Sequence, residues 1–193
     1  MLCKHIKFSV FVAVMNALIL CAVGAVDPNT LTPEQRVENY RKRVARKFIG
    51  EMAKEPGAIT LSSGLVVQVL ARGTGTQAAG PNDSCEVHYT GTLRDGSVFD
   101  SSRDRGQPAT FTPQQVIKAW TEALQLMRVG DRWKIYVPPE LGYGAHGAGP
   151  KIPPHSALVF DMELLSIKGG ATGRTAQEVD EVLKEASGNK ADL

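Results

Sequence analysis

The chain lacks a strong net charge of either sign. Among its 193 residues, 22 Lys and Arg face 20 Asp and Glu, which gives a net charge of +2. Lys4 and Lys7 lie in a predicted leader (below), and their removal leaves 20 basic against 20 acidic residues, a net charge of zero. Proteins that bind nucleic acid carry a basic excess. Nucleic acid is therefore not an expected partner.

Cysteine is also scarce. The sequence has three cysteines, and Cys3 and Cys21 fall in the predicted leader. Cys85 is then alone in the mature chain and cannot form an internal disulfide. It lies in an alternating apolar segment, which predicts a core residue rather than a reactive thiol.

Common catalytic motifs are absent from the sequence. The glycines around residue 75 match neither the dinucleotide pattern nor the P-loop, and no Gly-x-Ser-x-Gly elbow of a serine hydrolase occurs. His88, His146 and His155 do not share the spacing of metal ligands. We expect no cofactor and no metal. The remaining residues therefore predict an apolar cavity with a few placed polar groups, which acts without covalent chemistry.

The first 25 residues have the layout of a signal peptide. Lys4 and Lys7 precede an apolar run over residues 8–20, and small residues, Val23-Gly24-Ala25, follow it. The run is shorter than the roughly 20 residues of a spanning helix, so we expect no stable membrane insertion after cleavage. The mature protein is predicted to be secreted or periplasmic. An uncleaved anchor is the alternative.

A helical extension is predicted over residues 26–57. Thr32-Pro33-Glu34-Gln35 is a helix-start signature, and apolar residues recur at helical spacing up to Pro56-Gly57. The helix either dimerises, lies on a membrane surface, or packs on its own domain. Because Gly50 weakens the short stripe, a monomer is favoured over a dimer.

The period changes after Gly64. Alternation predicts strands at residues 65–70, 85–90, 97–100, 133–137 and 157–167. One short helix presents Val116, Ile117, Trp120, Leu124 and Met127 on a single face. The pattern predicts an α+β fold of antiparallel strands with one covering helix. The long loop over residues 140–156 is expected to be functional, and the tail, residues 169–193, to form a short surface helix.

Six motifs occur in a fixed order in this region. They are Val87-His88-Tyr89-Thr90-Gly91, Phe99-Asp100-Ser101-Ser102-Arg103, Val116-Ile117 with Trp120, Gly142-Tyr143-Gly144, Ile152-Pro153-Pro154-His155 and Leu158-Val159-Phe160. Through them, residues 61–168 resemble the FKBP family of macrolide-binding peptidyl-prolyl cis/trans isomerases. With its leader and helical extension, the chain resembles the secreted Mip-like (macrophage infectivity potentiator) branch, which adds a role in virulence as an expectation.

The resemblance implies a bent antiparallel sheet wrapped around one short helix, in an isomerase domain over residues 58–168. It implies proline-containing peptides and proteins as substrates and macrolides such as tacrolimus and rapamycin as inhibitors. Tyr89, Asp100 and Tyr143 are the implied catalytic residues, with Asp100 orienting Tyr143 or its neighbours. Trp120 would form the cavity floor, and Tyr143 and the Ile117 N–H would bind ligand carbonyls. The implied binding residues are Phe99, Phe111, Val116, Ile117, Trp120, Ile152 and Phe160.

The rim of the implied cavity departs from the family pattern. Ala109 stands where a phenylalanine is common, and Lys151 where an apolar residue is common; Arg105 is a third rim residue. We predict that Lys151 favours an acidic residue near the substrate proline. Two other functions stay open: a proline-directed binding module with little catalysis, and a folding chaperone that uses the helical extension.

Overall fold

The computed structural model describes residues 31–188, so the predicted signal peptide lies outside the described residues. The helices are α2 (Pro33–Met52), α3 (Lys118–Leu124) and α4 (Ala176–Gly188), with 3₁₀ turns η2 (Pro113–Gln115) and η3 (Pro139–Leu141). The strands are β1 (Ala58–Thr60), β2 (Val66–Ala71), β3 (Ser84–Leu93), β4 (Val98–Ser101), β5 (Ala109–Phe111), β6 (Arg132–Val137) and β7 (Leu158–Lys168).

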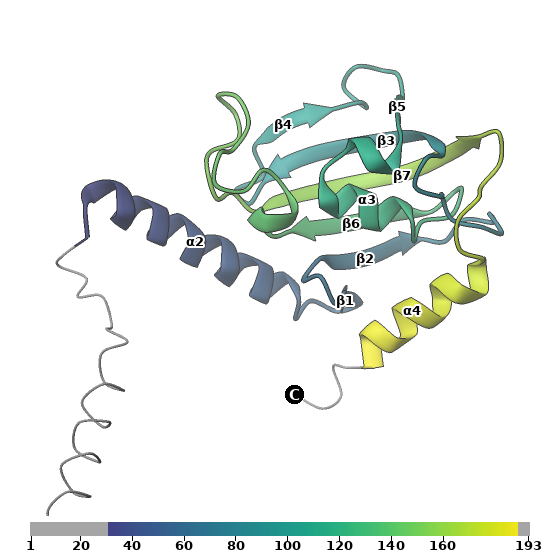
Figure 1. The fold of residues 1–193 in the computed structure, drawn as a ribbon, viewed down its shortest axis with the longest axis horizontal. Helices are drawn as coiled ribbons and strands as arrows, with labels where there is room; N and C mark the ends of the chain where they lie inside the picture. Colours follow the sequence, from purple (N-terminus) through teal and green to yellow (C-terminus); the bar gives the residue numbers. More distant parts are fainter. Residues whose placement is uncertain (1–30, 189–193) are drawn as a thin grey trace, which may run out of the picture. The chain divides into compact units, whose positions relative to one another are not determined.

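The strands form one antiparallel sheet, in the order β1-β2-β6-β7-β3-β4, and β5 also pairs with β3. α3 lies across one face of this sheet (Figure 1). The predicted α+β architecture is confirmed. All the predicted strands are present, and β1 and β5 are two three-residue strands that alternation did not indicate.

Alternation along the strands gives the sheet two different faces, because successive side chains point to opposite sides. On one face, Val67, Ile135 and Phe160 stand side by side on β2, β6 and β7. All three contribute to the main core, together with residues of α3. On the other face, the neighbouring row of Val66, Tyr136 and Val159 forms a second, smaller cluster.

α3 is shorter than its apolar stripe suggested. Val116 and Ile117 precede the helix in extended backbone, with ψ values of 176° and 151°. Thr121 anchors this start, because its hydroxyl donates to the Pro113 carbonyl at 2.5 Å. The stripe therefore identified the side that faces the sheet, while the backbone of its first two residues is not helical.

Both terminal helices begin with a capping box, and the one before α2 was predicted from the sequence. In α2 the Thr32 N–H donates to Gln35 Oε1 at 2.9 Å and the Gln35 N–H donates to Thr32 Oγ1 at 3.3 Å. In α4 the Thr175 N–H donates to Glu178 Oε2 at 2.8 Å. The expectation of a surface helix at the tail is wrong in one respect: Val179 and Leu183 are buried in the main core.

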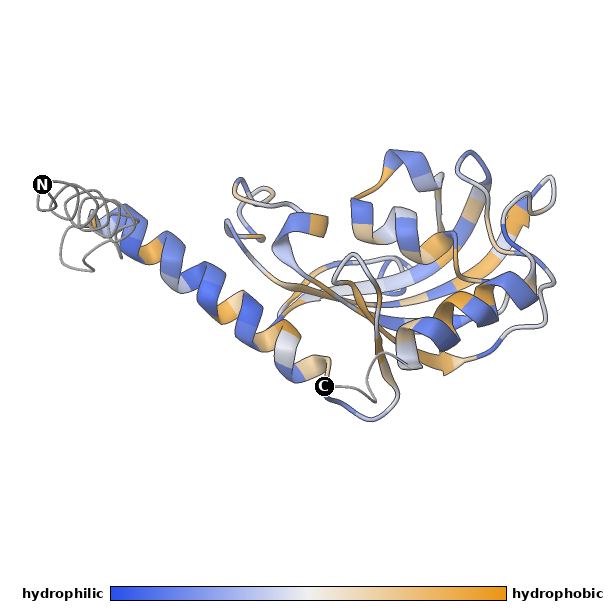
Figure 2. Ribbon diagram, turned by 60° about the horizontal axis from the view of Figure 1, so that its bottom comes forward, coloured by the Kyte–Doolittle hydropathy of each residue, from blue (hydrophilic) through white to orange (hydrophobic). Residues whose placement is uncertain are grey.

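α2 contributes to the second cluster through its C-terminal part. Phe48, Ile49 and Met52 pack there, and the Phe48 ring lies edge-on to Tyr136 at 6.2 Å. Earlier in the helix, the Tyr40 side chain is exposed, and most of α2 is hydrophilic (Figure 2). No helix within residues 31–188 is long and apolar enough to cross a membrane.

Candidate functional site: an aromatic cavity between sheet and helix

A cavity of about 440 Å³ opens between α3, the strands β3 and β4, and the loop after β6. Nine of the ten cavity residues expected from the sequence line it, and Gln115 joins them. The lining consists of Tyr89, Phe99, Asp100, Phe111, Gln115, Val116, Ile117, Trp120, Tyr143 and Phe160. Residues from six separate segments, which include β5 and β7, therefore meet at one place.

Trp120 is the centre of the aromatic lining. Its ring is edge-on to Tyr89 at 4.9 Å, to Phe160 at 5.3 Å and to Phe111 at 5.4 Å. Edge-to-face pairs of this kind are favourable beyond the area they bury. With 4% of its surface exposed, Trp120 is held rigidly from three sides. This arrangement gives the cavity a continuous aromatic surface.

Gly91 shapes the cavity although the sequence reasoning gave it no role. A Cβ atom there would lie 2.6 Å from Phe99 Cζ and 2.8 Å from Phe160 Cε1. The two rings, 5.5 Å apart, thus occupy the space that a side chain would fill. A glycine inside an alternating strand is the signal that could have indicated this close approach.

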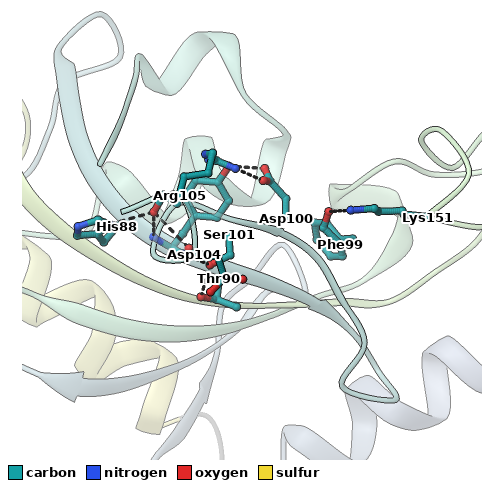
Figure 3. A network of polar contacts seen from close by, with 10 residues as sticks. His88, Thr90, Phe99, Asp100, Ser101, Asp104, Arg105 and Lys151 are labelled. Atoms are coloured by element: carbon teal, nitrogen blue, oxygen red, sulfur yellow. Dashed lines mark hydrogen bonds and ion pairs between the residues drawn. The ribbon is translucent and has the colours of Figure 1, made fainter. Parts of the chain in front are cut away.

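Tyr89, Asp100 and Arg105 form a polar cluster, and two of them, Tyr89 and Asp100, line the cavity. Figure 3 labels Asp100 and Arg105. The Tyr89 hydroxyl and the Arg105 guanidinium both donate to the Asp100 carboxylate. Arg105 also donates to the Tyr89 oxygen at 3.1 Å. The three groups close a triangle, and Asp100 therefore orients Tyr89, not Tyr143.

These contacts keep Asp100 ionised. Burial opposes its ionisation, but hydrogen bonds from Tyr89 and Arg105 and the Arg105 charge outweigh burial and lower the pKa of Asp100. Burial, followed by the bond to Asp100, raises the pKa of Tyr89. The cluster thus holds one carboxylate anion beside a neutral phenol at neutral pH.

Tyr143 stands apart from that cluster. Its side chain is 38% exposed, and its hydroxyl has no hydrogen-bond partner among residues 31–188. Burial and the Asp100 charge raise the pKa of Tyr143, so the hydroxyl stays protonated. It is a free donor at the cavity mouth.

Four residues expected at the cavity lie outside its lining, and Arg105, described above, is one of them. Ile152 is 6% exposed and packs in the main core, where its backbone pairs with Ala148. Ala109 pairs with Val87 in the sheet. The Lys151 ammonium donates to the Phe99 carbonyl at 3.1 Å (Figure 3), which ties the loop to β4. Their roles toward a ligand stay predictions.

The cavity has no machinery for covalent chemistry. Its lining includes no serine, cysteine, lysine or histidine. His88 bonds Ser102 at 3.1 Å, as a structural residue would. No group of three His, Cys, Asp or Glu within residues 31–188 could hold a metal ion. Burial, followed by the Asp83 charge, raises the pKa of the Cys85 thiol to about 11, so it is unreactive.

A larger cavity of about 850 Å³ is lined by the end of α2, β1, α3 and α4, including Leu61, Leu126 and Val182. It has no aromatic lining residue, and Lys54, Glu122 and Glu185 stand in it. The aromatic cavity is the better candidate site because it combines a rigid apolar floor with oriented polar groups.

The chain is similar to known proteins over most of its length. Residues 75–165 match the family described as FKBP-type peptidyl-prolyl cis-trans isomerase. The chain is 55% identical over 174 residues to the macrophage infectivity potentiator of Trypanosoma cruzi, covering 90% of this chain and 89% of that protein. It is 49% identical to FkpA of Aeromonas hydrophila over 74% of this chain, but spans only 52% of that relative.

Solved structures give the same result. The crystal structure of FkpA from Escherichia coli superposes with a TM-score of 0.65 at 32% identity, over 90% of this chain and 84% of that one. A peptidyl-prolyl cis-trans isomerase from Pseudomonas syringae gives a TM-score of 0.64 at 36% identity, over 72% of this chain and 98% of that one.

Proposed function

The chain belongs to the family of FKBP-type peptidyl-prolyl cis-trans isomerases and is an enzyme of that class, and we propose that it rotates X-Pro peptide bonds in the aromatic cavity. The observation that carries the proposal is the Trp120 floor with its three edge-on aromatic neighbours. A proline ring is compact and apolar, and it fits against such a surface.

The physical basis is the electronic structure of the amide. Rotation about a peptide bond costs about 18–20 kcal/mol because it breaks amide resonance. The planar amide carries partial negative charge on its oxygen, which water stabilises, and the twisted amide has lost much of that charge separation. An apolar floor therefore raises the planar state relative to the twisted one. Each tenfold acceleration requires about 1.4 kcal/mol.

Polar groups at the mouth would orient the substrate. The free hydroxyl of Tyr143 and the N–H of Ile117, which precedes α3, are the donors proposed for substrate carbonyls. The hydrogen bonds among Tyr89, Asp100 and Arg105 would fix the two side chains of this cluster that line the cavity, Tyr89 and Asp100. These contacts would be stronger for the twisted geometry, which is the requirement for catalysis.

We further propose that macrolides such as tacrolimus and rapamycin inhibit the enzyme by occupying this cavity. Its volume of about 440 Å³ lies in the range of small-molecule sites. Export is likewise proposed. The leader-like sequence of residues 1–25 supports it, and so does 45% identity, over 64% of this chain, to a Legionella longbeachae relative named outer membrane protein MIP.

The test is isomerisation of short X-Leu-Pro-Phe peptides, measured as kcat/KM with and without tacrolimus. We expect inhibitable catalysis, lowered about tenfold or more in Trp120→Leu and less in Tyr143→Phe and Asp100→Ala. Tyr136→Phe is the matched control, because that hydroxyl bonds Gln68 on the opposite face at 3.0 Å. A folded protein that binds proline peptides or tacrolimus without turnover would instead be a binding module.

Lys151 is proposed to select the residue beside the proline. Within residues 31–188 its ammonium donates to one backbone carbonyl, that of Phe99, so an acidic substrate side chain would be a better partner. We expect Glu-Pro peptides to exceed Lys-Pro peptides in kcat/KM by about two- to fivefold, and Lys151→Met to remove the difference. Equal values in the unmodified enzyme would contradict this role.

A further inference from the structure

His155 occupies an unusual position at the end of the loop that follows β6. Among residues 31–188, His155 is the non-glycine residue that has a positive φ, 58°. It is 9% exposed. Such a conformation costs free energy in a non-glycine residue and persists only where the surroundings hold it. Its N–H donates to the Gly144 carbonyl at 2.8 Å. This hydrogen bond joins the end of the loop to Gly144, the residue that follows Tyr143.

The His155 side chain is held by the helical extension. Its Nε2 atom lies 3.3 Å from Oε1 of Glu38 on α2. The same carboxylate oxygen lies 2.6 Å from the Lys42 ammonium. Glu38 is outside residues 75–165, the segment that matches the isomerase family. A residue of the extension thus contacts the loop that carries a cavity residue.

We propose that Glu38 and His155 are positioning residues through which α2 fixes the loop that carries Tyr143. The contact between the two side chains is stronger when His155 is protonated. The inference rests on the proposed function, because its consequence is a change in isomerase activity. Neither side chain lines the cavity. Both would act through the backbone that connects His155 to Gly144 and Tyr143.

The charges around the pair set the direction of the effect. The hydrogen bond and charge of Lys42, with a smaller contribution from His155, lower the pKa of Glu38, so the carboxylate is ionised throughout the neutral range. The loop's other titratable side chains are those of Glu140, Tyr143, His146 and Lys151. No ion pair or hydrogen bond among the described residues joins them to the His155 ring. Histidine changes its charge between about pH 5 and 8.

Protonation converts the contact from a neutral hydrogen bond to a charge-assisted one, which is roughly twice as strong. The contact is therefore stronger when the His155 ring carries a proton and weaker when the ring is neutral. Substrate affinity is expected to follow it, since Tyr143 would be better placed when the loop is held.

The first test is the pH profile of kcat/KM from about pH 5.5 to 8.5. We expect about a two- to threefold decline with rising pH, carried by KM rather than kcat. Glu38→Gln and His155→Asn should flatten it; asparagine tolerates a positive φ, so the latter keeps the loop backbone. Glu51→Gln is the matched control, since it removes a carboxylate of α2 that lies 3.7 Å from Lys47. A flat profile in the unmodified enzyme, or a decline that Glu38→Gln retains, would overturn the proposal.

The second test does not depend on activity. Hydrogen exchange of backbone amides in residues 142–156 should be slower at pH 6 than at pH 8, after correction for intrinsic rates, and faster in Glu38→Gln than in Glu51→Gln at pH 6. If the enzyme proved inactive, this measurement would still decide the proposal. Equal protection in the two variants would show that α2 does not hold the loop.

Discussion

α2 and α4 both begin with a threonine that exchanges hydrogen bonds with a side chain three residues later. Both also lie outside the residues that match the isomerase family. Yet α4 buries Val179 and Leu183 in the main core, while α2 packs Phe48, Ile49 and Met52 only partly, on the other face of the sheet. A capping box depends only on neighbouring residues. The surface against which a helix packs depends on which apolar surface the rest of the chain leaves uncovered.

The difference has a consequence for the enzyme. α4 completes the core on the face of the sheet that also carries the cavity, so it belongs to the structural body of the domain. α2 meets the domain through a small cluster and through the contact between Glu38 and His155. The extension is thus the part of the described chain better suited to modulate the site than to build it.

The largest expected effect tests the role of α4. Leu183→Ala removes a side chain that is 3% exposed and leaves a cavity in the core. We expect a loss of about 2–4 kcal/mol in the free energy of unfolding, measured by urea denaturation. Lys184→Ala, an exposed neighbour, should change it by less than about 0.5 kcal/mol. Unchanged stability in Leu183→Ala would show that α4 is an appendage after all.

A smaller effect is expected on α2. Phe48 is half-buried against Tyr136, so Phe48→Ala should lower the free energy of unfolding by about 1–2 kcal/mol, less than the same change at a buried position. Arg46→Ala, an exposed change on the same helix, is the control. If Phe48→Ala cost as much as Leu183→Ala in the same urea titration, the contrast between the two helices would disappear.

Much of the fold could be predicted because its longer strands alternate over part or most of their length. β3 buries every second side chain over most of its length, and β6 and β7 alternate over part of theirs and each have three consecutive buried side chains. β1 and β5 have three residues each, too few for a period to be read. The burial of α4 was missed because an amphipathic stripe does not say how deeply its apolar side will lie.

The members of the site could be predicted better than their contacts. Trp120 and Phe160 were expected in the cavity from ordered motifs, and they line it. The partner of Asp100 could not be derived, because it depends on the register between β3 and β4, where Gly91 pairs with Asp100 and a bulge follows. That register places the carboxylate beside Tyr89. The Glu38–His155 contact likewise joins residues 117 positions apart in the chain, which no local pattern reports.

The placement of the two tryptophans has an optical consequence. Trp133 is completely buried in β6, and Trp120 lines the aromatic cavity. Both indole rings lie in apolar surroundings, and neither ring nitrogen has a hydrogen-bond partner in the described part of the chain. One fluorophore thus responds to the integrity of the sheet and the other to whatever occupies the cavity. The two tryptophans can therefore serve as intrinsic fluorescence probes, and a Trp120→Phe substitution would separate their signals.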